Sequence, residues 1–448
     1  MIRKNLLGPL LVVVALLLAT RPAHTQDTPA KTLAECIEIG LANHPSLKAA
    51  SASVEAGNER VWEAASGYLP SLTAIYRADR QHTNLATSTG TVGTGGTSRT
   101  FNFYRGIVSF SQVLFDFGQT LDSIRAAQAS RDALEADRNT QKASVIFGVK
   151  QAYFTLITAH HLLSVADETV RQNQQHLELA EGRHEVGLAP KIDVTTAKVQ
   201  LSTSQLNQLT ASNSLAIGRE TLRNALGLDG PLTFDVVDLG EIRPNAPAAN
   251  DAVQRAYDNR PELRSLQLQG QALEEQVSSL QKHYLPTING NGQYQWAGSQ
   301  YPLQDTWDLY ATVNLTQFNF ASVRAQIAEA KANLANLRYN EDVERQSIAL
   351  EVRQAVLNVQ QAVQSIDVAR QGRDKARENL EIAEGRYQTG VGSIIELTDA
   401  QASRTTAEAN YVQAQYSYET SLAALEKATG TDLSATNPND ISTRNLHE

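Results

Sequence analysis

The strongest constraint on this chain is that it contains the same segment twice. The segment AEGRHEVGLAPKIDV at residues 180–194 returns as AEGRYQTGVGSIIEL at residues 383–397, with six of fifteen positions identical and a spacing of 203 residues. A second match pairs Tyr68-Leu69-Pro70 with Tyr284-Leu285-Pro286. A repeat of roughly 200 residues indicates a pair of equivalent domains, because solenoid units are much shorter. The chain is therefore predicted to be a tandem duplication.

The N-terminus has the layout of a secretory signal peptide. Arg3 and Lys4 precede a largely apolar run at residues 6–19, and a more polar stretch ends near residue 26. This order is typical of a cleaved export signal, and the run is short for a membrane span. Cleavage after Thr25 would remove three basic residues and change the net charge from −9 to about −12 (−9 − 3). Such an acidic chain is a poor candidate for nucleic-acid binding.

The repeat, the signal and the composition divide the chain into five parts. We expect a signal peptide at 1–25, a first repeat at 26–227, a linker at 228–250, a second repeat at 251–430 and a polar C-terminal tail at 431–448. The first repeat is predicted to hold a β-hairpin at about 69–115 and long helices at about 118–185 and 190–227. The second is predicted to hold a hairpin at about 285–318 and long helices at about 321–388 and 393–429.

Cys36 is the only cysteine, so no disulfide can form within the chain. Bacterial lipidation requires a small residue before the cysteine, and Glu35 stands there. The alternative is a buried position on a helix, because Thr32 and Glu35 have the spacing of a capping box and Cys36 and Ile37 fall on one apolar face. We expect Cys36 to lie in the core.

Each repeat contains residues that alternate between apolar and polar. In the second repeat, Ile288, Tyr294 and Trp296 lie on one face of a strand, and Asn289 and Gln295 lie on the other. A period of two over about ten residues, with aromatic residues near the ends, is typical of strands in outer-membrane barrels. The alternative is an ordinary hairpin that packs one face on a soluble core.

The predicted helices are unusually long. Residues 118–184 contain no proline and no glycine cluster, which at 1.5 Å per residue gives a helix of roughly 100 Å. In the second repeat, Val352, Val356, Val359 and Val363 step by four and three, as in a heptad seam. A helix of this length cannot bury its apolar residues within one small domain. It must lie against other long helices.

The four predicted strands imply an assembly of several chains. Four strands cannot close a barrel, and an open sheet edge is not tolerated in lipid. Closed barrels of the outer-membrane type start at about eight strands. We therefore expect the chain to oligomerise, with the same symmetry closing the long helices into a tube.

With this layout, the sequence resembles the TolC-type outer-membrane efflux channel family over about residues 31–430. The resemblance rests on the duplicated helix-hairpin-helix layout, the Tyr-Leu-Pro entry to each first strand and the Gly-Arg-x-x-x-Gly turns. It implies an α+β membrane protein, in which a long antiparallel α-helical barrel is continuous with a transmembrane β-barrel of four strands per protomer. It further implies a homotrimer with twelve strands in the cell outer membrane and a twelve-helix tube extending into the periplasm.

The resemblance also implies a periplasmic gate. Glu396 and Asp399 match an acidic constriction, which three copies would arrange as two carboxylate rings that favour cations. Asp193 and Tyr387 match a pair that helps hold the mouth shut. The basic partner of that network would fall at Gly392, which carries no charge.

Local chemistry leaves the role of these residues open. Either Lys191 or Arg386 takes the place of the missing basic partner, or the lock is weaker here. Judged from the local sequence alone, Glu396 and Asp399 are acidic residues that stabilise a helix N-terminus.

Two short turns complete the implied site. Their tips are Val186-Gly187-Leu188 and Thr389-Gly390-Val391. Gly187 and Gly390 read as helix terminators. The resemblance adds that these tips dock a periplasmic adaptor (membrane fusion) protein, which connects to an inner-membrane transporter.

No motif for catalysis, cofactor binding or metal binding is found. The sequence lacks a P-loop and a Gly-x-Ser-x-Gly motif, and the adjacent His160 and His161 point in different directions on a helix. We therefore expect no enzyme, but a passive export duct of a tripartite efflux or type I secretion system. The alternative is a trimeric coiled-coil structural or adhesive surface protein without channel activity.

Overall fold

The computed structural model describes residues 30–85, 97–238, 240, 242, 244, 251–315 and 320–430. The expected signal peptide and C-terminal tail lie outside the described residues, as do parts of the first hairpin loop and of the linker. The first repeat and linker contain β1 (Ala30–Lys31), α1 (Leu33–Asn43), α2 (Pro45–Ala65), η1 (Ser66–Tyr68), β2 (Ser71–Leu85), β3 (Thr97–Phe115), α3 (Gln119–Glu185), α4 (Lys191–Ala225) and β4 (Asp235–Val236). The second repeat contains α5 (Ala252–Asn259), α6 (Pro261–Lys282), β5 (Thr287–Gly298), β6 (Gln304–Asn314), α7 (Phe320–Gln388) and α8 (Ile394–Thr429).

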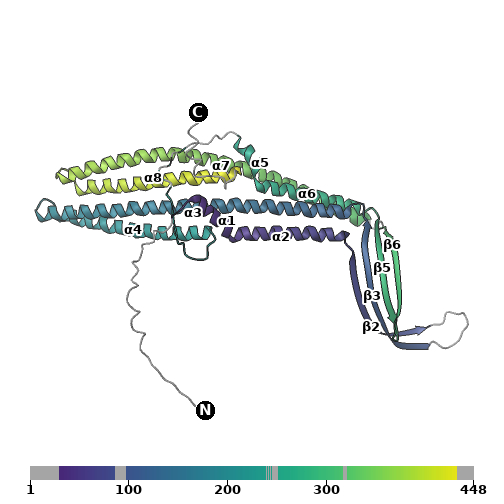
Figure 1. Cartoon of the computed structure of the whole chain (residues 1–448). Coiled ribbons are helices and arrows are strands. Elements are labelled where there is room, and N and C mark those ends of the chain that lie inside the picture. Colours follow the sequence, from purple (N-terminus) through teal and green to yellow (C-terminus); the bar gives the residue numbers. More distant parts are fainter. Residues whose placement is uncertain are drawn as a thin grey trace, which may run out of the picture.

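The helices form one elongated layer, and the sheet projects at an angle from one end of it (Figure 1). The long helices α3 and α7 run the length of the layer. Along α3, α2 covers one half and α4 the other, while α6 and α8 lie between α3 and α7 in the same way. Thus α7 forms one edge of the layer, and α2 and α4 form the other.

The main core lies at the waist, where the short and long helices meet. The heptad seam of α7 contributes Val352, Val359 and Ile366, all buried there. Thr32 caps α1 through the expected capping box with Glu35, and Cys36 is buried in the same cluster. Burial raises the pKa of the Cys36 thiol to about 12, so this cysteine is an unreactive core residue.

The strands form a four-stranded antiparallel sheet in the order β2-β3-β5-β6. The two hairpins are joined through β3 and β5, which come from different repeats and pair from Tyr104 with Gly298 to Phe115 with Ile288, around an irregularity near Val113. In the single chain β2 and β6 are therefore edge strands.

The register of the sheet separates its side chains into two faces. One face is apolar, and its members on β2, β3, β5 and β6 are Leu72, Ala74, Tyr76, Val108, Phe110, Tyr294, Trp296, Trp307, Leu309 and Val313. The other is polar, and its members include Ser71, Thr73, Arg77, Ser109, Ser111, Asn289, Asn291, Gln293, Asp308 and Thr312. The alternation seen in the sequence thus becomes one apolar and one polar surface.

The junction between sheet and helices is held by Asp116, which is buried. Its carboxylate accepts hydrogen bonds from the backbone N–H groups of Gly118 at 3.0 Å and Thr120 at 2.7 Å. Phe117 and Gly118 both adopt left-handed backbone conformations, with φ of 56° and 82°. These two residues turn the chain from β3 into α3, and Asp116 satisfies the free donors at the helix start.

In each repeat the last helix ends against the connection between the first two helices. A Cβ on Gly227 would lie 2.7 Å from the Cα of His44, and a Cβ on Gly430 would lie 3.0 Å from the carbonyl carbon of Asn259. Both glycines have positive φ. Beside the first of these contacts, β1 pairs in parallel with β4 of the linker. The entry and exit of each repeat therefore touch at the waist.

The observed fold agrees with the predicted helix-rich α+β architecture. The closed barrel is predicted for three chains together. In the single chain, the four strands β2, β3, β5 and β6 form an open sheet with two free edges. Four strands are too few to curl into a closed ring.

Candidate functional site

The candidate site is the tip of the helical layer, where α3 turns into α4 and α7 turns into α8. Both turns are Schellman motifs with a glycine in the left-handed conformation. In the first, the N–H of Leu188 donates to the carbonyl of Arg183, and in the second the N–H of Val391 donates to that of Arg386. Gly187 and Gly390 have φ of 77° and 82°. The predicted helix terminators therefore act as such.

The residues around these glycines project apolar side chains into solvent. Val186, Leu188 and Val391 are 69%, 70% and 71% exposed. Thr389 is also exposed, and its hydroxyl donates to the carbonyl of Gly385. Exposed aliphatic side chains at adjacent turns form a small apolar surface of the kind that protein partners cover.

Tyr387 lies in the centre of the tip and is only 2% exposed. It packs in a small apolar cluster with Leu380, Ile394 and Leu397. Among the described residues its hydroxyl has no hydrogen-bond partner of ordinary geometry. Burial raises the pKa of Tyr387, and the nearby Asp193 carboxylate raises it further. The structure thus brings Asp193 and Tyr387 together.

Arg183 is the residue that connects the two helical hairpins at this point. Its guanidinium lies over the Tyr387 ring, 5.1 Å from the ring centre. Nη1 donates to the carbonyl oxygens of Tyr387 at 2.6 Å and Gln388 at 3.1 Å. A cation that bonds the last carbonyls of a helix also interacts favourably with the helix dipole. The predicted site did not include Arg183, although its identity with Arg386 in the repeat was a signal.

Glu396 and Asp399 lie on the first turns of α8, and both are exposed. The N–H of Glu396 donates to the Ser393 hydroxyl, which caps the helix. The Glu396 carboxylate accepts a hydrogen bond from Nε of Arg386 at 2.9 Å. No ion pair of Asp399 occurs within the described ranges. Arg386 therefore forms an ion pair with Glu396 within its own helical hairpin. The second candidate partner, Lys191, is exposed and has no ion pair in the described chain.

Gly392 is required by the close approach of the chain to itself. Its N–H donates to the carbonyl of Arg386 at 2.9 Å. A Cβ at this position would lie 3.0 Å from Cβ of Arg386 and 3.1 Å from the backbone nitrogen of Tyr387. The tight turn thus explains why no basic side chain stands here.

The interface between the two hairpins is polar for several turns above the tip. His176 on α3 lies 3.3 Å from Glu384 on α7, and Arg404 on α8 donates to Gln172 on α3 at 2.8 Å. The hydroxyls of Thr169 and Thr405 lie 3.1 Å apart. Polar contacts of this kind fix the relative position of two hairpins without a continuous apolar seam.

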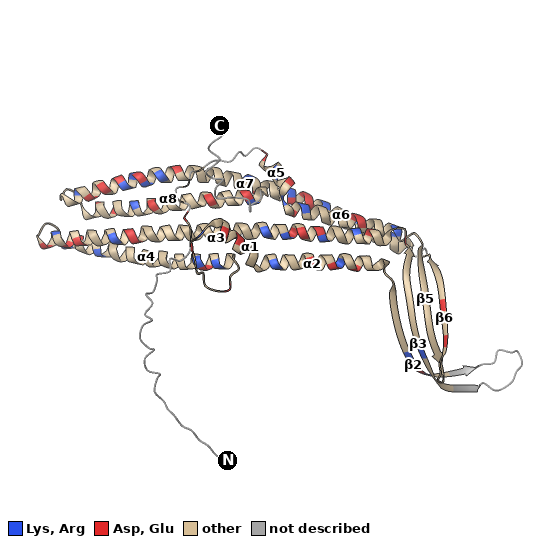
Figure 2. Ribbon diagram, in the orientation of Figure 1, with Lys and Arg blue, Asp and Glu red and all other residues tan. Residues whose placement is uncertain are grey.

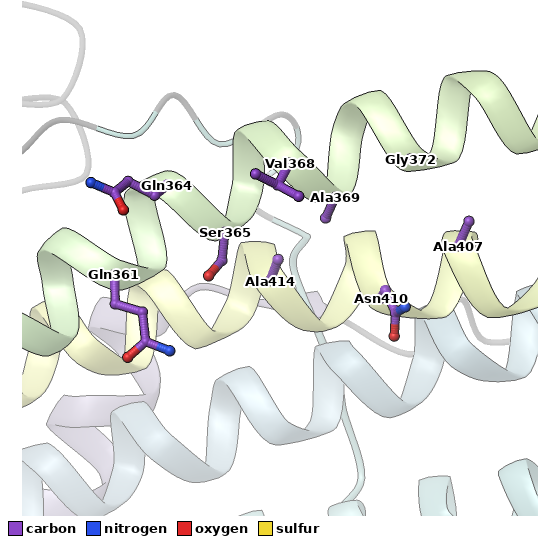
Figure 3. A pocket seen from close by; sticks show the side chains of 9 residues that line it. All are labelled: Gln361, Gln364, Ser365, Val368, Ala369, Gly372, Ala407, Asn410 and Ala414. Atoms are coloured by element: carbon purple, nitrogen blue, oxygen red, sulfur yellow. The ribbon is translucent and has the colours of Figure 1, made fainter.

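A groove of about 600 Å³ lies between α7 and α8, away from the tip (Figure 3). Its lining residues are Gln361, Gln364, Ser365, Val368, Ala369, Gly372, Ala407, Asn410 and Ala414. None of them is an acid or a base that titrates near neutral pH, so nothing in the lining would activate the Ser365 hydroxyl as a nucleophile.

Two features are absent from the described residues. No helix in this part of the chain combines the length and the apolar character needed to cross a membrane. No group of three or more His, Cys, Asp or Glu side chains is placed to hold a metal ion there.

Comparisons with known proteins are consistent with one family. The model of the outer membrane efflux protein family matches residues 37–228 and 252–431. The chain is 25% identical over 419 residues to the outer membrane protein TolC of Salmonella enteritidis, covering 90% of this chain and 82% of that protein. It is 22% identical over 414 residues to the toluene efflux pump outer membrane protein TtgC of Pseudomonas putida, covering 89% and 82%.

Solved structures show the same fold. The CusC structure superposes with a TM-score of 0.78 at 18% identity, covering 89% of this chain and 92% of that one. The outer membrane channel CmeC of Campylobacter jejuni gives 0.76 at 18% identity, covering 92% and 88%.

Proposed function

The chain belongs to the outer membrane efflux protein family, and on that premise we propose that three copies form one passive export duct. It is an outer-membrane protein that extends into the periplasm, and the family is one of transport channels, not enzymes. In the proposed homotrimer the three open sheets close into a twelve-stranded barrel in outer-membrane lipid, and the three helical layers close into a tube. The structural or adhesive alternative is not favoured by this family membership.

The observation that supports the duct is the open sheet with one apolar and one polar face. A barrel in lipid needs an apolar outer surface and, when it conducts, a polar interior. The edge strands β2 and β6 run in opposite directions, because the sheet has four antiparallel strands. When copies are related by rotation about one axis, β6 of one copy would therefore lie antiparallel to β2 of the next copy. An even total number of strands then closes the ring with every neighbouring pair antiparallel.

The helical layer gives independent support. The edge helix α4 carries Ile192, Val199 and Leu206 at intervals of seven, all more than half exposed. The opposite edge helix α7 carries Val343, Leu350 and Leu357 at the same interval, also more than half exposed. A heptad stripe of apolar residues on a single long helix is the pattern of a seam that packs against another helix.

We place the closable mouth of the duct at the tip. The two helical hairpins are linked there by Asp193, Tyr387 and Arg183. One face of α8 carries two exposed acids, Glu396 and Asp399. Three copies would bring six such carboxylates around the axis, of which the three from Glu396 are paired with Arg386. The remaining negative charge favours cations over anions. The exposed turn tips 186–188 and 389–391 are the proposed surface for a periplasmic adaptor protein, which couples the duct to an inner-membrane transporter.

The test is single-channel conductance of the purified protein in a planar bilayer. The wild-type protein should give small, cation-selective openings, and Glu396→Ala with Asp399→Ala should reduce the selectivity. A control with the same charge change, Asp132→Ala with Glu135→Ala on α3 far from the tip, should keep it. Conductance that is unchanged in the first double variant would remove the assignment of the mouth. A trimer that inserts and never conducts, even with the tip opened by substitution, would refute the duct.

A further inference from the structure

The two edge strands of the sheet are unpaired in the single chain. Leu72 on β2 is 73% exposed and Leu309 on β6 is 78% exposed, whereas Phe110 and Trp296 on the inner strands are about half as exposed, at 37% and 39%. An edge strand presents a row of free N–H and C=O groups, which cannot remain unpaired in lipid. Each edge therefore needs another strand beside it.

We propose that β6 of one copy pairs with β2 of the next copy in the register that sets Asn314 opposite Ser71. This inference rests on the proposed trimer and adds the residues that join its subunits. The choice of register starts from the strand ends, because Ser71 is the first residue of β2 and Asn314 is the last residue of β6. Both residues lie at the helical end of the sheet, so the pairing would use β6 over its whole length.

The same register pairs two opposite charges at once. Arg77 lies six residues after Ser71, and Asp308 lies six residues before Asn314. In an antiparallel pair these two side chains then stand directly opposite each other.

A second pair follows at the next charged positions. Arg80 lies nine residues after Ser71, and Asp305 lies nine residues before Asn314. Basic residues on β2 and acidic residues on β6 are also visible as blue and red segments at the two sides of the sheet (Figure 2). Opposite charges directly across an antiparallel pair stabilise it.

Within one chain, only some of these four charged side chains have a hydrogen-bond or ion-pair partner. Nε of Arg77 donates to Asp79 at 2.6 Å, and the Tyr294 hydroxyl donates to Asp305 at 3.0 Å. Arg80 and Asp308 have no ion-pair partner in the part of the chain that the structure describes. The proposed register supplies a partner for each of these two residues.

The remaining pairs also match in character. On the apolar face, Leu72, Ala74, Tyr76 and Ala78 would stand opposite Val313, Ala311, Leu309 and Trp307. On the polar face, Ser71 and Thr73 would stand opposite Asn314 and Thr312. Each side chain thus meets one of its own kind on the same face, as inside the chain.

Neighbouring registers do not have these properties. A shift of one residue would turn the faces over, so that apolar residues of β2 meet polar residues of β6. A shift of two residues in one direction would set Asp308 opposite Asp79, and like charges directly opposite are destabilising. A shift of two in the other direction would set Asp308 opposite Ile75 and Asp305 opposite Ala78, which removes both ion pairs.

The register also gives a reasonable barrel. Inside one chain the ladder connects Arg77 through Arg105 and Ala297 to Gln304. Across the proposed seam Gln304 would face Gln81, four residues further along β2 than Arg77. Three seams then add up to a shift of roughly twelve residues along the strand direction on one circuit of the twelve-stranded barrel. With about 3.3 Å per residue along a strand and about 4.8 Å between neighbouring strands, this shift corresponds to a strand tilt of about 35° from the barrel axis. Barrel strands typically tilt by 35–45°.

The test is disulfide crosslinking between subunits of the full-length protein. Variants are made in a Cys36→Ala background, so that only introduced cysteines react. Thr73→Cys with Thr312→Cys and Arg77→Cys with Asp308→Cys place cysteines directly opposite across the proposed seam. The control, Asp79→Cys with Asp308→Cys, places them two residues out of register. We expect crosslinked dimers and trimers on non-reducing gels, with a yield at least about threefold higher for the two opposed pairs than for the control, because diagonal neighbours are about 2–3 Å further apart.

Charge exchange gives a second readout that needs no cysteine. Arg77→Asp alone should lower the temperature at which the trimer dissociates, and Arg77→Asp with Asp308→Arg should restore it. A higher crosslinking yield from the Asp79 and Asp308 pair would overturn the register and leave the trimer intact. A wild-type protein that remains monomeric in detergent and in lipid would instead overturn the proposed trimer itself.

Discussion

Arg183 and Arg386 occupy equivalent positions in the two repeats and make different contacts. Arg386 bonds Glu396 within its own hairpin, whereas Arg183 crosses to the other hairpin and bonds the last carbonyls of α7. The sequence could identify both arginines as repeated. It could not tell which one crosses, because that depends on the packing of hairpins that are distant in sequence.

Arg183→Ala should therefore weaken the tip more than Arg386→Ala. Loss of a charged donor to two backbone carbonyls is expected to cost about 1–3 kcal/mol locally, whereas loss of an exposed ion pair costs less than about 1 kcal/mol. Hydrogen–deuterium exchange at the C-terminal end of α7 measures the difference, and the Arg183 variant should also show larger channel openings. Equal exchange in the two variants would contradict the inference that Arg183 holds the two helical hairpins together.

Glu419 on α8 is expected to make stability depend on pH. Burial and the nearby Glu426 carboxylate raise the pKa of Glu419 from 4.5 to about 7, although Lys150 partly offsets them. A carboxyl with a raised pKa in the folded state binds more protons there than in the unfolded chain. The free energy of unfolding therefore falls as pH rises from about 4.5 to about 7 and is constant above that range, with a total change of a few kcal/mol at most.

Glu419→Gln keeps the neutral form at every pH and should remove this loss. Thermal unfolding should then occur at higher temperature than wild type near pH 8 and at the same temperature near pH 4. Glu378→Gln is a suitable control, because Glu378 is exposed and a hydrogen bond from Lys375 lowers its pKa. No gain is expected from the control at pH 8, and an equal gain from both variants would rule out burial as the cause.

At the scale of elements, the turn after α7 depends on the absence of a side chain at Gly392. Gly392→Ala should destabilise the turn by about 1–3 kcal/mol, because its Cβ would press on Arg386 and on the backbone of Tyr387. Gly385→Ala is the matched control, since a Cβ there meets nothing within 4 Å and alanine favours helix by roughly 0.5–1 kcal/mol. Circular dichroism on heating compares the two, and a Gly392 variant as stable as the Gly385 variant would contradict the packing argument.

Local patterns predicted the type of most elements, for identifiable reasons. The alternation from Ile288 to Trp296 and the heptad steps from Val352 to Val363 report which side of an element is buried. Such patterns carry no information about which elements pair across the repeats. The contact of β3 with β5 joins strands from different repeats, and only tertiary packing decides it. The two-residue strands β1 and β4 are too short to form a periodic pattern.

The candidate site was predictable to a similar extent. Gly187 and Gly390 were recognisable from turn chemistry alone, because only a residue that accepts positive φ ends a helix in this way. Asp193, Tyr387, Glu396 and Asp399 were identified through resemblance to a family. Their roles in a gate remain proposals that the conductance experiment addresses.

At the scale of the whole molecule, the helical layer and the sheet each end in two free edges. Val199→Asp with Leu206→Asp on the edge helix α4 should prevent trimer formation, because each buries a charge in the seam of the proposed tube. Helix content should stay unchanged, since both side chains are exposed in the single chain. Mass photometry measures the oligomeric state.

Asn207→Asp serves as the control, because Asn207 lies beside Leu206 on the exposed surface of α4 and points away from the heptad stripe by about 100°. This variant should remain trimeric. Trimers of unchanged stability from the double aspartate variant would exclude α4 from the subunit interface.

The contacts that Gly227 makes with His44 and Gly430 makes with Asn259 have a consequence for how such a ring can be encoded. Because each repeat starts and finishes at the waist, the peptide between the repeats has to cross the layer there but does not have to run along its length. A six-unit ring can then be divided among genes in more than one way, as three chains of two units or as six chains of one. Cutting the linker and expressing the two halves as separate polypeptides should therefore leave the path of every helix and strand unchanged.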